Sequence, residues 1–144
     1  EIHERLVGSE MCIRDRVVLP PQAEKEAGFL SALERLANVV GNTGAKAVFY
    51  AAPATLDLIR ERFARSSNEI GYVPFVNWED FLIVSRDVRT DDTLWIWMSR
   101  RNGVSYESSM ARVSRYLDQY FKGNNFVLVY PLQASIDEGS RYLT

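Results

Sequence analysis

Residues 91–131, DDTLWIWMSRRNGVSYESSMARVSRYLDQYFKGNNFVLVYP, decide the fold class. Residues 93–98 and 126–130 are uncharged runs rich in aromatic and β-branched side chains, and each run predicts a buried strand. Between the two runs, apolar residues recur at helical spacing at Met110, Val113, Leu117 and Phe121. Two uncharged strands joined by an amphipathic helix are typical of a parallel sheet that is covered on both faces.

The same alternation continues upstream of this stretch. Strands are predicted at 17–20, 45–51 and 70–76, and helices at 27–40, from Pro53 and from Asn77. Pro74 interrupts the third strand, which favours a position at the edge of the sheet. Strands that alternate with helices in this way predict a single-domain α/β fold, in which a three-layer structure is built around an open parallel sheet of five strands.

The first sixteen residues, EIHERLVGSEMCIRDR, contain no hydrophobic period and no uncharged run. Within them, residues 7–16 resemble translated sequencing-adapter sequence. We therefore expect a non-native or disordered leader at 1–16 that contributes nothing to folding, an α/β domain at 17–133 and a mobile tail at 134–144. The alternative for the leader is a genuine disordered terminus.

Composition excludes several classes of function. The chain has 17 basic and 19 acidic residues, so no surplus of positive charge attracts nucleic acid. Its only histidine, His3, and its only cysteine, Cys12, both lie in the leader. The predicted domain therefore lacks the side chains for thiol catalysis, histidine acid–base catalysis and zinc binding. We expect no enzymatic activity and no bound metal.

The loop after the fourth strand contains the candidate binding residues. Ligands of parallel sheets bind beyond the carboxyl ends of the strands, and this loop is Ser-Arg-Arg-Asn-Gly-Val-Ser at 99–105. Arginine side chains, together with amides at the start of the next helix, would bind an anion or a nucleotide. The candidates are Ser99, Arg100, Arg101, Asn102, Gly103 and Ser105, with Ser105 able to cap that helix. The alternative is that both arginines are solvated or paired with neighbouring acids.

Three blocks of the sequence resemble a known family. They are VVLPPQAEKEAGF at 17–29, WEDFLIVSRDVRTDDTLWIWMSRRNGVSY at 78–106 and YFKGNNFVLVYPLQ at 120–133. The blocks resemble the cytosolic C-terminal domain of Bacteroidetes-type cation:proton (sodium/proton) antiporters, in which a domain like the universal stress proteins follows the membrane transporter. The resemblance implies a universal-stress-protein-like, Rossmann-like sheet of order 3-2-1-4-5.

The same resemblance implies a function and a set of partners. It implies a non-catalytic regulatory or dimerisation domain, attached to a membrane transporter domain in the same polypeptide. That domain would be cytoplasmic and would lie at the cytosolic face of the inner membrane. We also expect a homodimer that forms through strand 126–130 or an adjacent helix, because this strand would lie at an edge of the sheet.

The match departs from nucleotide-binding universal stress proteins at two places. Those proteins have an aspartate after strand one and a Gly-x2-Gly-x9-Gly-Ser/Thr loop after strand four. This chain has Pro20–Pro21 at the first place and a single glycine, Gly103, at the second. Backbone amides need glycine to approach phosphate closely, so we expect no cofactor and no nucleotide. The alternative function is a stand-alone stress-type module that binds a nucleotide or an anion.

Overall fold

The computed structural model describes residues 2–5, 14–44, 46–78, 81–100, 103–121 and 123–131. The strands are β1 (Ile2–Arg5), β2 (Arg14–Val18), β3 (Lys46–Ala51), β4 (Ile70–Pro74), β5 (Thr93–Trp97) and β6 (Asn125–Val129). The α-helices are α1 (Phe29–Thr43), α2 (Pro53–Arg62), α3 (Phe81–Val84) and α4 (Val113–Tyr120). Two 3-10 helices are η1 (Ala23–Lys25) and η3 (Ser108–Arg112).

The strands form one sheet in the order β1-β6-β5-β2-β3-β4. The five strands β2 to β6 are parallel, and when they are numbered along the chain their order is 3-2-1-4-5. The predicted five-stranded parallel sheet and its strand order are therefore confirmed. β4, which ends at Pro74, lies at one edge, and β2 and β5 are neighbours at the centre.

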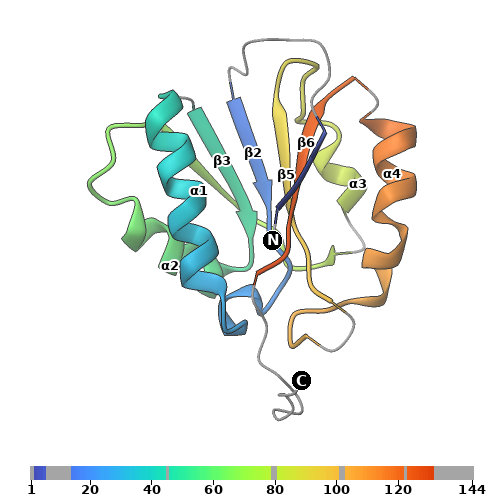
Figure 1. Ribbon diagram of the computed structural model, residues 1–144, viewed down its shortest axis with the longest axis horizontal. Helices are drawn as coiled ribbons and strands as arrows, with labels where there is room; N and C mark the ends of the chain where they lie inside the picture. The colour runs from blue at the N-terminus through green and yellow to red at the C-terminus, as the bar shows by residue number, and fades with distance from the viewer. Residues whose placement is uncertain are drawn as a thin grey trace.

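Helices cover both faces of the sheet, with α1 and α2 on one side and α3 and α4 on the other (Figure 1). Alternate residues of β5 contribute to both cores. Trp95 and Trp97 pack on the side of α1 and α2, whereas Leu94 and Ile96 pack on the side of α3 and α4. A strand buried on both faces has no solvent-facing position, which explains why its sequence carries no charge. Among the described residues, no helix combines the length and the apolar character needed to cross a membrane.

Gly44 ends α1. The predicted helix at 27–40 begins two residues later, at Phe29, and continues through Gly41 to Thr43. Gly44 has φ of 68°, in the left-handed region that glycine adopts easily, and its N–H donates to the carbonyl of Val40 over 3.0 Å. Gly41 lies inside the helix, so the second glycine of the pair is the one that sets the helix end.

The predicted boundary between leader and domain is wrong. β2 begins at Arg14 instead of residue 17, and it pairs with β3 from Arg14 and with β5 from Asp15. Asp15 and Arg16 are both buried. The Asp15 carboxylate accepts a hydrogen bond from Trp95 Nε1 over 3.0 Å, and Arg16 Nε donates to Asp92 over 2.8 Å. Both buried side chains thus have polar partners, and the last three residues of the expected leader belong to the central strand β2.

The expected leader also contains a strand. β1 pairs with β6 in antiparallel fashion, with Ile2 opposite Val129 and Arg5 opposite Phe126. The sequence predicts that the strand at 126–130 lies at an edge of the sheet. In the structure it does not, because β1 pairs with its outer side. Pairing through main-chain hydrogen bonds does not require an apolar run, so a polar sequence can form such a strand. Residues 6–13 and 132–144 lie outside the described part of the chain, and the origin of 7–16 stays a prediction.

Candidate functional site

The crevice between the ends of β2 and β5 is the place where this topology would bind a ligand. The two strands are parallel neighbours, and from them the chain continues toward opposite edges of the sheet. Loops that leave two such strands separate above and below the sheet and open a crevice at their carboxyl ends. Here the two loops are residues 19–28, which lead into α1, and residues 98–107, which lead into η3.

The side chain of Glu26 occupies this crevice. One of its oxygens, Oε2, accepts hydrogen bonds from Ser99 Oγ over 2.9 Å, from the Ser105 backbone N–H over 2.9 Å and from Ser105 Oγ over 2.6 Å. Only 5% of Glu26, 3% of Ser99 and 2% of Ser105 are exposed. A carboxylate can be buried to this extent because it accepts several hydrogen bonds. The loop after β2 is thereby joined to the loop after β5.

The loop that carries Glu26 is fixed by its own contacts. Gln22 has φ of 69°, an uncommon left-handed conformation for a residue other than glycine, and it precedes η1. The Glu26 N–H donates to the carbonyl of Ala23, and the Glu26 carbonyl accepts from the N–H of Phe29 at the start of α1. Glu24 accepts a hydrogen bond over 2.6 Å from Thr55, a buried residue of α2. These contacts direct Glu26 toward the crevice and Glu24 toward α2.

The structure brings together only part of the predicted anion site. Ser99 and Ser105 meet at Glu26, while Gly103 and Arg100 form a turn in which the Gly103 N–H donates to the Arg100 carbonyl over 2.7 Å. The Arg100 guanidinium lies over the ring of Tyr130, 4.7 Å from its centroid, in a cation–π contact. Arg101 and Asn102 lie outside the described residues.

The sequence predicts that Ser105 caps the next helix, but in the structure it does not. The next helical turn, η3, begins three residues later at Ser108, and the Ser105 hydroxyl and amide both donate to Glu26. The role of Glu26 was not predicted, because the acid of nucleotide-binding stress proteins directly follows strand one, whereas Glu26 lies six residues beyond Pro20. The available signal was an acidic residue two positions before Gly28, the N-cap of α1.

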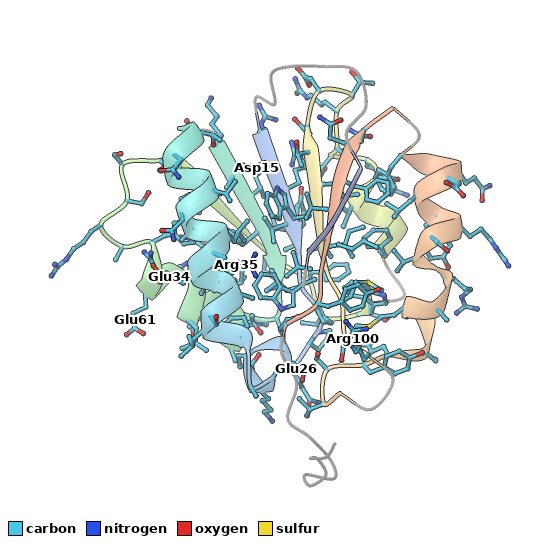
Figure 2. All side chains as sticks on the ribbon, in the orientation of Figure 1. Asp15, Glu26, Glu34, Arg35, Glu61 and Arg100 are labelled. Atoms are coloured by element: carbon cyan, nitrogen blue, oxygen red, sulfur yellow. The ribbon has the colours of Figure 1, made fainter. Side chains whose placement is uncertain are left out.

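Glu26 and Arg100 lie at the same end of the sheet (Figure 2). The Glu26 carboxylate puts a negative charge where an anion would need positive charge and unoccupied donors. A phosphate approaching the Ser105 amide would meet that charge at short range in a site shielded from water, where the repulsion is strong. In its observed state the crevice therefore disfavours an anionic ligand.

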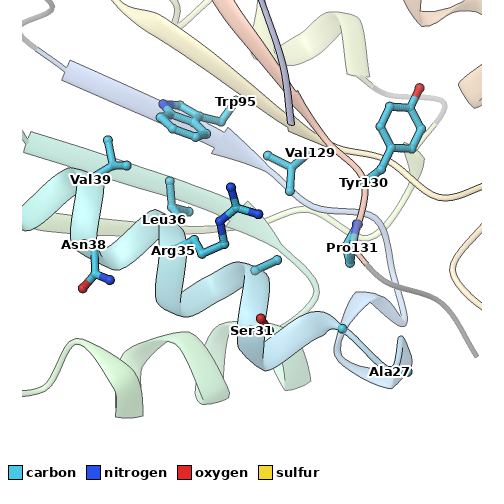
Figure 3. A pocket seen from close by; sticks show the side chains of 12 residues that line it. Ala27, Ser31, Arg35, Leu36, Asn38, Val39, Trp95, Val129, Tyr130 and Pro131 are labelled. Atoms are coloured by element: carbon cyan, nitrogen blue, oxygen red, sulfur yellow. The ribbon is translucent and has the colours of Figure 1, made fainter. Parts of the chain in front are cut away.

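A groove lies beside the crevice, between α1 and β6 (Figure 3). Its volume is about 460 Å³, its floor includes Trp95 and Val129, and Tyr130 and Pro131 form one end. Arg35 is the charged residue among those that line it, and its guanidinium points into the groove. The described residues that line the groove include no carboxylate, so they offer neither an acid–base pair nor an anionic ligand set for a cation.

A second polar cluster, in which Arg16, Tyr50 and Asp92 are buried and Asp87 is exposed, lies near the opposite end of the central strands. Asp92 accepts hydrogen bonds from Arg16 Nε over 2.8 Å and from the Arg89 N–H over 2.9 Å. Arg16 also donates to the Tyr50 hydroxyl over 2.6 Å, and this hydroxyl donates to Asp87 over 3.1 Å. Burial raises the pKa of Tyr50 to about 12, so the phenol stays protonated. Every member of the cluster is used in holding its neighbours, which is the pattern of a structural network.

Metal binding has no support in the part of the chain that the structure describes, where no three acidic, histidine or cysteine side chains are grouped as ligands. Comparison with known proteins gives no relative: no protein-family model, no curated protein and no solved structure matches the chain. Any functional assignment therefore depends on the fold, on the Glu26 contacts and on the sequence resemblance.

Proposed function

We propose that this chain is a non-catalytic regulatory or dimerisation domain of a monovalent cation:proton antiporter, at the cytosolic face of the inner membrane. Two things support the proposal: the three sequence blocks that resemble such domains, and the parallel sheet of order 3-2-1-4-5 that the resemblance implies. Ion translocation would then belong to the membrane domain of the same polypeptide, and this domain would act through contacts with protein.

The observation that carries the proposal is the carboxylate of Glu26 in the crevice between β2 and β5. A stress-type module that works by binding a nucleotide needs amides and hydroxyls available to phosphate oxygens. In this chain the Ser105 amide and the hydroxyls of Ser99 and Ser105 already donate to Glu26. The crevice that would bind a nucleotide is occupied by the protein itself, which favours a protein-contact role over the alternative of a nucleotide or anion module.

Dimer formation would use the side of β6 that faces away from β5. In this chain β1 pairs with that side of the strand. If the leader predicted at 1–16 is non-native, the parent protein lacks β1 and its β6 would present unpaired N–H and C=O groups. Such an edge pairs readily with a second copy of itself. The homodimer is therefore proposed for chains that lack β1.

Thermal melting with millimolar ATP, AMP or sulfate tests the proposal. A ligand at one hundred times its Kd stabilises a protein by about 2.7 kcal/mol, which is readily seen in a melt. We expect no nucleotide-dependent shift. A shift that Arg100→Ala abolishes, and that Arg65→Ala leaves intact, would favour the nucleotide module instead. Arg65 is a suitable control because it is an exposed arginine that follows α2, outside the crevice.

The parent assignment has a separate test. The genomic DNA upstream of the codon for Val17 is expected to encode a series of hydrophobic segments, each about 20 residues long and able to cross a membrane. An upstream reading frame without such segments would reject the antiporter parent, whatever the result of the nucleotide melts.

A further inference from the structure

The donors around Glu26 have the arrangement of an oxyanion site. A backbone N–H and two hydroxyls converge on a single carboxylate oxygen, at 2.9, 2.9 and 2.6 Å. Backbone amides and hydroxyls that point at one oxygen are the groups with which proteins bind the oxygens of carboxylates and phosphates. These three donors come from one loop, residues 99–105, whereas the acceptor comes from another loop 79 residues away in sequence.

The acceptor is held in place as part of the chain. Glu26 lies between η1 and α1, and both of its backbone groups are hydrogen-bonded there. A group attached in this way has a high effective concentration at the site it occupies, so a dissolved anion competes poorly with it. The Ser99 hydroxyl also lies 3.2 Å from the Arg100 carbonyl, so removal of the Glu26 side chain would cost most at Ser105, whose buried amide and hydroxyl would lose the acceptor they share.

We propose that Ser99 and Ser105 form an oxyanion-binding site of which Glu26 is the built-in occupant, and that the site takes a small external oxyanion when this carboxylate is removed. The ligand class is a carboxylate or a phosphoryl group small enough to replace the end of a glutamate side chain. The inference rests on the proposed function and extends it, because donors that already bind Glu26 are not available to the phosphates of a nucleotide.

Chemical rescue of Glu26→Ala tests this inference. The variant is expected to melt several degrees below the native protein. Sodium formate should raise its melting temperature in a saturable manner, by more than sodium chloride of equal ionic strength. Sodium phosphate, as a second arm, distinguishes a site that takes only carboxylates from one that also takes phosphoryl groups. A response to either anion supports the proposal, and a response to neither overturns it.

Three controls make the result specific. Glu26→Gln keeps the shape of the side chain and still offers an oxygen to the three donors, so it should fold and show no saturable response to formate. Glu61→Ala removes an exposed glutamate of α2 and should behave like the native protein. Ser105→Ala in the Glu26→Ala background removes one donor to the anion and should weaken formate binding about tenfold.

A Glu26→Ala chain that does not fold without ligand still gives an answer. Formate or phosphate should then restore its helical circular dichroism signal in a titration. If the chain stays unfolded in both anions while Glu26→Gln folds, the donors do not form an anion site and the proposal fails. The outcome is separable from that of the proposed function, which depends on how the native protein responds to ATP and AMP.

Discussion

The hydroxyl of Ser105 donates a hydrogen bond to the carboxylate of Glu26 over 2.6 Å, although 79 residues separate the two in sequence. This contact joins the two loops that a sheet of this topology normally leaves apart. In ligand-binding members of the α/β class the equivalent crevice is open at the carboxyl ends of the central strands. Here the carboxylate of Glu26 takes that place, so an internal group stands where other members of the class bind an external one.

Asp92→Ala is expected to destabilise the fold by about 3–5 kcal/mol, because it leaves the charge of Arg16 buried without its partner. The two side chains are only 9% and 2% exposed, so water cannot replace the lost carboxylate. Urea unfolding measures the change. Replacing both residues, as Arg16→Met with Asp92→Leu, should recover most of the loss, since the buried charges are then removed together.

The control for this pair is Asp57→Ala. Asp57 forms an exposed ion pair with Arg60 over 3.4 Å within α2. Its removal should change stability by less than about 1 kcal/mol. Equal losses in Asp92→Ala and Asp57→Ala would show that the buried network does not contribute as its geometry indicates.

Asp15→Asn is expected to stabilise the protein at neutral pH. Burial raises the pKa of Asp15 above its value in the unfolded chain, although the hydrogen bond from Trp95 acts in the opposite direction. Between the two pKa values the folded state binds more protons than the unfolded state. The stability contributed by this residue is therefore full at acidic pH and is lost as the pH rises through the folded-state pKa. The asparagine variant does not titrate, so it avoids that loss.

Urea unfolding at several pH values checks this sign. The stability of the native protein relative to Asp15→Asn should fall as the pH rises from below 3.8, the ordinary pKa of the residue, to neutrality. Asparagine keeps an oxygen that accepts from Trp95 Nε1, so the hydrogen bond is preserved in the comparison. A difference that does not depend on pH would show that the Asp15 carboxylate has no raised pKa.

Two N-terminal truncations distinguish the contribution of β1 to stability from that of the first residues of β2. A chain that begins at Arg14 loses β1, a four-residue strand that pairs with one neighbour, and its melting temperature should fall by only a few degrees. A chain that begins at Val17 also loses Arg16 and leaves Asp92 buried without it. The second truncation should be less stable than the first by about 3 kcal/mol or more.

If the whole leader contributed nothing to folding, as the sequence predicts, the loss of residues 14–16 would not change stability. Two truncated chains with the same melting temperature would restore that view. Differential scanning calorimetry of the two purified chains, at one protein concentration, is sufficient to decide between the alternatives.

The chain that begins at Arg14 is expected to self-associate, because the loss of β1 exposes the hydrogen-bonding edge of β6. Light scattering at tens of micromolar should show a dimer for the truncated chain and a monomer for the full chain. Val127 is not a suitable position for a charge that disrupts the dimer. Its side chain is buried in the core on the side of α1 and α2, so a charged replacement would unfold the domain. A truncated chain that remains monomeric would contradict the proposed dimer.

The core strands were predictable because their signals are local. β5 and β6 are uncharged runs, and Pro53 and Gly44 mark a helix start and a helix end where glycine and proline have direct conformational effects. The order of the strands was not encoded in periodicity and came from the resemblance alone. Local patterns identify elements, whereas the order of elements in a sheet depends on contacts between distant residues.

The errors concern charged residues whose partners are distant in sequence. Asp15 and Arg16 resemble solvent-exposed residues until Trp95 and Asp92, 80 and 76 positions away, are placed beside them. The same holds for Glu26, whose donors lie 73 and 79 residues further along the chain. A single sequence does not show which acids will meet a donor in the folded state. Two of the candidate residues, Ser99 and Ser105, meet in the structure at Glu26, a residue that the sequence did not bring to attention.

The antiparallel ladder between β1 and β6 places the two ends of the described chain side by side, with Ile2 opposite Val129 (Figure 1). Adjacent strands are about 4.8 Å apart, so a linker of a few residues is long enough to connect β6 directly to β1. New ends could be opened in the exposed turn at residues 65–67, between α2 and β4. In such a circular permutant β1 becomes the second arm of a β-hairpin, and its pairing no longer depends on the segment that connects it to β2.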